Sequence, residues 1–192
     1  CIQRGQQVIL VSSGSVAAGK KWLDVESPSK GLKKAMASVG QTQMMAVWGE
    51  LLGEPLAQIL LTHADLCNRE RYMSIKETIE SLLEYGVIPV INENDTVTSE
   101  EVKVGDNDNL AAMAASAIDA DALIMCTDVN GLYNENPHAN PNAKLLSQVD
   151  QITPELYDMA GGAVSSTGTG GMQTKIEAAE KSTAHGIDTF II

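Results

Sequence analysis

The chain has 192 residues, of which 44% are hydrophobic and 20% charged, a composition typical of a globular domain. The 25 acidic against 13 basic residues give a net charge of −12, which is unfavourable for binding nucleic acid. No apolar run approaches the ~18 residues that span a membrane, and the three cysteines without CxxC spacing favour a cytoplasmic location.

Short apolar runs alternate with longer helical patterns along the chain. Five runs have the length and β-branched content of buried strands, namely 7–11, 57–62, 87–91, 122–127 and 188–192. Four helical patterns lie between them, at 27–52, 68–86, 109–121 and 172–186. This alternation predicts an α/β fold, a three-layer αβα sandwich whose mainly parallel sheet is covered on both faces. Cys126, in the fourth apolar run, is accordingly expected in the core.

Small residues follow the first predicted strand, where Ser12, Ser13 and Gly14 lead into a helix. Ligands of parallel sheets bind at the carboxyl ends of strands, and small residues let the backbone approach them. The turn is therefore a candidate for binding an anion or substrate. A plain strand-to-helix turn with a serine N-cap explains the same residues.

Two clusters of acid and amide side chains come next, in the stretches INENDTV and KVGDNDNLAA. Their members are Asn92, Glu93, Asn94 and Asp95, then Asp106, Asn107, Asp108 and Asn109. Asx-turns explain the first cluster as well as ligand binding does. Helix capping explains one or two residues of the second cluster, but not four. Together the clusters predict a polar pocket that binds an α-amino group or holds a catalytic lysine in position.

The stretch SSTGTGGMQTK is the strongest phosphate-binding pattern in the chain. Gly168, Gly170 and Gly171 open a helix, and Lys175 lies about one turn inside it. The pattern is not a Walker A motif, because that motif places its lysine beside the last glycine. A glycine-rich linker is the alternative, although a linker would not normally lead straight into an amphipathic helix.

Thr127 and Asp128 follow the fourth predicted strand and precede an Asn-Gly turn. They are candidates for contact with a nucleotide or its metal, and a capped turn explains them equally. The three histidines are scattered through the chain, so that we predict no metal site built from protein side chains.

The motifs together resemble the amino acid kinase family. The matching stretches are VSSGSVAAGK, ASVGQ, LLTHADL, RERY, VIPVINENDTV, KVGDNDNLAA, TDVNGLY and GTGGMQTK, and they cover nearly the whole chain. The pair INEND and KVGDNDNL is the most specific, because acetylglutamate kinase, aspartokinase and uridylate kinase share the fold without that pair. The resemblance implies an acetylglutamate kinase-like fold and phosphorylation of the γ-carboxylate of L-glutamate by ATP and Mg²⁺, the first step of proline synthesis.

Site roles follow from the resemblance by position. It implies that Lys175 and Asp108 are catalytic, the first stabilising the transferring phosphoryl group and the second organising the lysines. It implies glutamate binding by Ser13, Gly14, Asn92, Asp95, Asp106 and Asn107. It implies ATP binding by Thr127, Asp128, Thr169, Gly170, Gly171, Met172 and Lys175.

The resemblance also implies a homo-oligomer with proline as feedback inhibitor. The family begins with a strand and a glycine-rich turn that have no counterpart here, and the chain stops inside an apolar run. We therefore expect 1–192 to be a piece of the kinase domain, without a PUA domain and inactive alone. Two alternatives stay open: another family member acting on a different carboxylate or on carbamate, and a non-catalytic piece that binds glutamate or proline.

Overall fold

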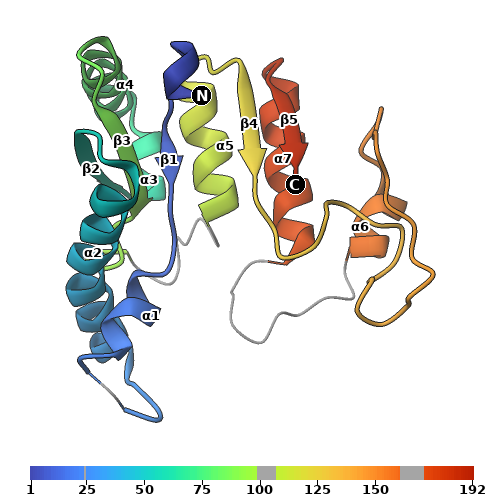
Figure 1. The fold of residues 1–192 in the computed structure, drawn as a ribbon, viewed down its shortest axis with the longest axis horizontal. Helices are drawn as coiled ribbons and strands as arrows, with labels where there is room; N and C mark the ends of the chain where they lie inside the picture. Colours follow the sequence, from blue (N-terminus) through green and yellow to red (C-terminus); the bar gives the residue numbers. More distant parts are fainter. Residues whose placement is uncertain (24, 99–106, 161–170) are drawn as a thin grey trace. The chain divides into compact units, whose positions relative to one another are not determined.

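Strands and helices alternate along the chain, as the sequence pattern predicts (Figure 1). The computed structural model describes residues 1–23, 25–98, 107–160 and 171–192. The chain divides into two compact units, Cys1–Lys103 and Val104–Ile192, and each contains its own parallel sheet. All three strand pairs are parallel, which confirms the predicted α/β class.

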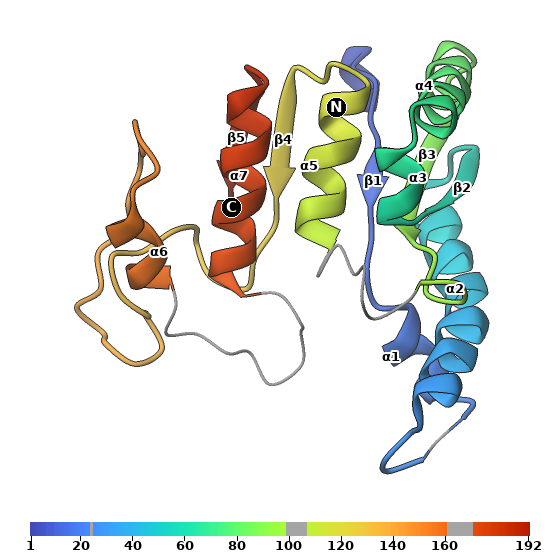
Figure 2. The same ribbon diagram turned by 180° about the vertical axis from the view of Figure 1, so that it is seen from behind.

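The first unit is built on a three-stranded sheet in the order β1-β3-β2 (Figure 2). Strand β1 spans Leu10–Val11, β2 spans Leu56–Leu61 and β3 spans Ile88–Glu93. The central strand β3 is buried from its first residue to its fifth, as its continuous apolar run predicts. The first strand is shorter than the predicted 7–11.

The helices of the first unit begin and end where the sequence provides caps. They are η1 (Ile2–Arg4), α1 (Ser15–Lys20), α2 (Lys30–Leu52), α3 (His63–Cys67) and α4 (Arg69–Glu84). Ser29 is the N-cap of α2, and its hydroxyl oxygen accepts a hydrogen bond from the Leu32 backbone N–H. Gly53, in a left-handed conformation, is the C-cap. Gly86, which follows α4, has φ 72° and so adopts the left-handed conformation that commonly ends a helix.

Helices α1 and α2 pack unusually closely because glycines lie at their crossing. A Cβ atom on Gly19 would lie 1.8 Å from the Met36 carbonyl oxygen. One on Gly40 would lie 1.7 Å from the carbonyl oxygen of Ser15. Neither position accepts a side chain without moving backbone, so these glycines determine where Ser15 lies relative to α2.

The second unit pairs strands β4 (Ala122–Met125) and β5 (Asp188–Ile191). Its helices are α5 (Asn107–Ala117), α6 (Pro154–Ala160) and α7 (Met172–Ala184). Leu132, Leu156, Ala160 and Ile176 form a core cluster. Through it, the loop that contains Leu132 and helix α6 pack against α7. Both α5 and α7 run back along the strand that follows them, so that their N-termini lie at the carboxyl ends of β4 and β5 (Figure 1).

The strands of the second unit are not buried on both faces, and this part of the prediction is wrong. Their residues alternate between buried and exposed, with Ile124 54% and Phe190 51% exposed. Cys126, expected in the core, is also exposed. The reason is that α5 and α7 pack on one face, while the described residues of this unit provide no cover for the other. No helix in the described part of the chain is long and apolar enough to cross a membrane.

Candidate active site

In the first unit, the loops after β1 and β3 meet through a hydrogen bond. The Ser15 hydroxyl donates to the Asp95 carboxylate across 3.2 Å, and Ser15 is buried. The two loops meet because β1 and β3 are neighbours that run the same way. Sequence reasoning selected Ser13 and Gly14 and missed Ser15. Three serines in four positions gave no signal to separate them.

Ser13 and Gly14 lie beside this contact in the same turn, and both are exposed. Gly14 is the N-cap of α1 and has φ 107°, a left-handed conformation that favours glycine. Ser13 offers its backbone carbonyl oxygen to the Ser12 hydroxyl at 3.4 Å. The turn therefore exposes a hydroxyl and a side-chain-free backbone at the end of β1.

A pocket of about 220 Å³ opens beside Asp95 within the first unit. It is lined by residues of α2, β2 and the turn after β3, namely Ala37, Ser38, Gln41, Thr42, Gln58, Leu60, Glu93, Asn94, Asp95 and Thr96. Two of the lining side chains are carboxylates, and none is basic. The first cluster therefore forms an acceptor-rich wall, which suits a cationic ammonium group.

Three side-chain amides connect α2, β2 and β3 at this pocket. Asn92 donates to Gln41 Oε1 at 2.9 Å, and Gln41 donates to Gln58 Oε1 at 3.1 Å. Asn92 is 2% exposed and is not among the lining residues, while Gln58 is exposed at the pocket. Asn92 thus lies behind the pocket wall rather than on its surface.

In the second unit, Asp108 and Lys175 form the predicted association of an acid with a lysine. The Lys175 ammonium lies 2.8 Å from Asp108 Oδ1 and 3.0 Å from Oδ2, and both side chains are mostly buried. The Thr174 hydroxyl lies 3.0 Å from the same carboxylate and 2.7 Å from the Gly171 carbonyl oxygen. Each carboxylate oxygen thus has a donor within reach, which fixes the lysine at the N-terminal turn of α7.

Neighbouring contacts hold α5 and α7 in this arrangement. Lys181 donates to Asn109 Oδ1 at 2.6 Å, and Asn109 donates to Glu177 at 3.4 Å. Sequence reasoning did not identify Thr174 or these partners, because residues 66 to 72 positions apart reveal their contact only once the helices are packed. Asn107 begins α5 and is half-buried.

The predicted nucleotide residues of the second unit lie at the ends of β4 and α7. Thr127 is half-buried and its backbone N–H donates to the Ile192 carbonyl oxygen at 2.8 Å, while Asp128 is exposed. Gly171 is the N-cap of α7 and provides no side-chain cap, and Met172 packs against the core cluster. Asp106, Thr169 and Gly170 lie outside the described residues.

Comparison with known proteins places this chain. The profile of the amino acid kinase family matches residues 1–192. The chain belongs to the amino acid kinase family. It is 55% identical to the glutamate 5-kinase of Idiomarina loihiensis and 57% identical to glutamate 5-kinase 1 of Pseudoalteromonas translucida, in both cases over its whole length. It spans 52% of each of these relatives, about half their length.

A solved structure agrees with the family at the level of fold. The chain is similar to isopentenyl phosphate kinase, with a TM-score of 0.60 over 97% of this chain and 74% of that one. The sequence identity is 18%, so that this likeness concerns the fold alone. The predicted amino acid kinase fold, an α/β fold with parallel sheets, is thereby confirmed, and only the predicted cover of both sheet faces is not met by the described residues of the second unit.

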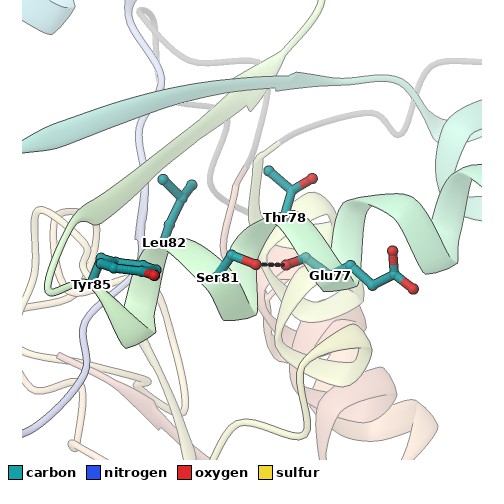
Figure 3. A pocket seen from close by; sticks show the side chains of 5 residues that line it. All are labelled: Glu77, Thr78, Ser81, Leu82 and Tyr85. Atoms are coloured by element: carbon teal, nitrogen blue, oxygen red, sulfur yellow. Dashed lines mark hydrogen bonds between the residues drawn. The ribbon is translucent and has the colours of Figure 1, made fainter.

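A surface hollow of about 570 Å³ lies on α4 in the first unit of this amino acid kinase (Figure 3). It is open and runs along one side of α4, where it is lined by Glu77, Thr78, Ser81, Leu82 and Tyr85. The Ser81 hydroxyl donates to the Glu77 carbonyl oxygen, an ordinary bond within a helix. Because a single helix forms it, the hollow brings no chemistry together.

A third acid at a strand end of this kinase has a structural role. Asp65 follows β2 and completes a capping box with Thr62, while its other oxygen lies 2.8 Å from Arg71. Burial raises the pKa of Asp65, but the hydrogen bonds from Thr62 and Arg71 outweigh it and hold the pKa below its usual value. The same carboxylate chemistry as in Asp95 is here used to begin a helix.

Proposed function

We propose that the full-length protein transfers the γ-phosphoryl group of ATP to the γ-carboxylate of L-glutamate, forming glutamyl 5-phosphate. The observation that carries this proposal is the Lys175–Asp108 pair at the start of α7, in a chain whose similar relatives are glutamate 5-kinases. Phosphoryl transfer is catalysed mainly by positioning and by positive charge on the moving group. In a chain with a net charge of −12, such charge must come from placed lysines, metal and N–H groups.

Lys175 stabilises the transferring phosphoryl group in this mechanism. An ammonium carries three N–H donors, and Asp108 engages two of them at most, which leaves one for an oxygen of the moving group. Asp108 holds the lysine in place and accepts no proton from the substrate. Thr174 is a positioning residue, because its hydroxyl lies within hydrogen-bond reach of the Asp108 carboxylate and of the Gly171 carbonyl oxygen.

ATP is held in the second unit at the N-terminus of α7. Backbone N–H groups at a glycine-rich helix start suit phosphate oxygens, and Gly171 brings no side chain that would cap this end instead. The residues assigned to ATP are Thr127, Asp128, Thr169, Gly170, Gly171, Met172 and Lys175.

Magnesium enters with the nucleotide. Among the described residues no three His, Cys, Asp or Glu side chains come together as a metal site. Mg²⁺ bound with the nucleotide would neutralise charge on the ATP phosphates.

Glutamate binding is assigned to residues of both acid–amide clusters, and the pocket beside Asp95 supports the part of the assignment that concerns the first cluster. The Asp95 carboxylate, fixed by Ser15, attracts the substrate ammonium group in the acceptor-rich pocket. The remaining residues assigned to glutamate are Ser13, Gly14, Asn92, Asp106 and Asn107. Proline carries the same α-carboxylate and a cationic nitrogen, and we propose it as the feedback inhibitor of a cytoplasmic homo-oligomer.

Turnover by the full-length protein tests this function. ADP release should depend on L-glutamate with ATP and Mg²⁺, and hydroxylamine should trap the acyl phosphate as a hydroxamate. Release with aspartate, N-acetylglutamate or carbamate in place of glutamate would instead identify another amino acid kinase. Binding of glutamate or proline without ADP release under any of these conditions would identify a non-catalytic sensor.

A further inference from the structure

A directional chain of hydrogen bonds leads from the backbone of β3 to the 220 Å³ pocket. The Glu93 backbone N–H donates to Asn92 Oδ1 at 2.8 Å, and the Asn92 amide then donates to Gln41. Gln41 in turn donates to Gln58 Oε1. Each amide therefore accepts with its oxygen on one side and donates with its nitrogen on the other.

The backbone end of the chain fixes its direction. A backbone N–H can only donate, so Asn92 must turn its oxygen towards Glu93 and its nitrogen towards Gln41. Reversing any one amide would place two N–H groups or two carbonyl oxygens face to face. Because Asn92 and Gln41 are 2% and 6% exposed, water offers little compensation for such a mismatch.

We propose that this relay of Asn92, Gln41 and Gln58 makes the exposed end of Gln58 a hydrogen-bond donor that binds the carboxylate of an amino-acid ligand. With its oxygen occupied by Gln41, Gln58 presents its NH₂ group to the pocket that it lines. Asn92 and Gln41 are positioning residues that act through Gln58. The inference rests on the proposed function and assigns the part of the pocket that receives the ligand's carboxylate.

The charge distribution of the pocket fits a zwitterion. Asp95 supplies negative charge for an ammonium group, and none of the described side chains that line the pocket is basic. Gln58 is the lining side chain whose donor role the relay dictates, since the Thr42 and Thr96 hydroxyls already donate to the Val39 carbonyl oxygen and to Asn94 Oδ1, and the Ser38 hydroxyl can rotate to donate or accept. A neutral donor binds the carboxylate without cancelling the field that attracts the ammonium group.

Two substitutions of Gln41 separate a relay from a merely structural contact. In Gln41→Glu, both oxygens accept, so Asn92 keeps its partner while Gln58 must reverse and present its carbonyl oxygen to the ligand. In Gln41→Met, the chain is cut and Gln58 can still turn its NH₂ group to the pocket. A structural role predicts that Met is worse, because it leaves the Asn92 amide without Gln41. The relay predicts that Glu is worse for the ligand.

The measurement is the glutamate and ATP KM of the full-length enzyme, with Tm values for each variant. Gln58→Met and Gln41→Glu should each raise the glutamate KM about 10- to 100-fold, as expected for a lost bond to a charged group, with the ATP KM unchanged. Gln41→Met should raise the glutamate KM less than Gln41→Glu does, although it should lower the Tm more. Ser38→Glu adds a charge to the same pocket without touching the relay, and should raise the glutamate KM less than Gln41→Glu.

Three results would overturn the relay: an unchanged glutamate KM in Gln58→Met, a larger increase in Gln41→Met than in Gln41→Glu, or equal increases in Gln41→Glu and Ser38→Glu. Its failure can be told from failure of the proposed function by ligand-induced shifts in Tm across a panel of L-amino acids. A wild-type protein that is stabilised by an amino acid but phosphorylates none of the panel contradicts the kinase only, and the variants are then ranked by that shift. Stabilisation by no amino acid contradicts the relay.

Discussion

The two acid–amide clusters look alike in the sequence but serve different purposes in the structure. The first, Asn92–Asp95, faces a pocket with neutral amides behind it and a serine on its aspartate. In the second, the described residues Asn107–Asn109 open α5 and bond to side chains of α7, including two lysines. In the first cluster the Asp95 carboxylate is bonded to a hydroxyl, and in the second the Asp108 carboxylate holds an ammonium group.

The difference shows that the role of a carboxylate depends on the group to which it is hydrogen-bonded. Asp95 is bonded to a hydroxyl, which leaves its charge available to attract an ammonium group. The Asp108 carboxylate forms an ion pair with the Lys175 ammonium group, and its charge therefore orients that lysine. Phosphorylating a carboxylate requires both: one region that binds a zwitterion, and another that offsets the charge of the phosphoryl group.

The largest expected effect concerns the second cluster. Lys175→Ala in the full-length protein should lower kcat about 10²–10³-fold, the scale for removing one preorganised charge-stabilising group. Steady-state kinetics measure it. Lys181→Met is the matched control, since Lys181 also bonds from α7 to α5 but serves Asn109. An unchanged kcat with a raised ATP KM for Lys175→Ala would show that the lysine binds ground-state ATP instead.

The next largest effect concerns the residues assigned to glutamate binding. Asp95→Ala and Asn107→Ala should each raise the glutamate KM by roughly 10- to 150-fold, the cost of a lost hydrogen bond to a charged group, with little change for ATP. Titrating each substrate at saturation of the other separates the two constants. Asp65→Asn, which alters a carboxylate at the end of the neighbouring strand, is the control. Normal glutamate kinetics in both alanine variants would refute the assignment of the pocket.

Much of the secondary structure could be predicted, because apolar runs, helix caps and glycines in the local sequence specify where strands and helices begin and end. The β3 run lies between a left-handed glycine and a polar cluster, and the ends of α2 follow from Ser29 and Gly53. The alternation in β4 and β5 could not be predicted, because apart from Asp188 and Thr189 the residues on both faces of these strands are apolar. Which face is covered depends on the helices that pack there.

The contacts within the site were harder to predict than its location. Strand ends and glycine turns indicated where ligands bind, but not that Ser15 would bond to Asp95 or that Thr174 would bond to Asp108. Gln58 looked like an ordinary strand residue, and its partners lie 17 positions away and beyond. Such pairings depend on strand register and helix crossing, which no local pattern encodes.

A smaller effect tests the packing beneath the first cluster. Gly40→Ala should lower the free energy of unfolding by about 1–3 kcal/mol, because the added methyl meets the Ser15 backbone. Gly49→Ala, on the same helix with only Leu56 at 4.0 Å, should instead raise it by about 0.5–1 kcal/mol. Urea denaturation compares the two. Equal responses would show that the α1–α2 crossing does not constrain Ser15.

The smallest expected effect compares Asp65, an acid with a structural role, with Asp95, an acid assigned to ligand binding. Asp65 has a pKa below its ordinary value of 3.8, because the hydrogen bonds from Thr62 and Arg71 outweigh the effect of burial. Its contribution to stability is therefore fully present above that ordinary value and is lost as the pH falls through the lowered pKa. Asp65→Asn should reduce the free energy of unfolding by about 1 kcal/mol at neutral pH, the usual size of a lost helix cap. Urea titrations between pH 7 and the acid limit of folding should show the two proteins converging below about pH 4, with the glutamate KM unaffected throughout. A difference in stability that persists undiminished in acid would mean that the Asp65 charge is not what begins α3.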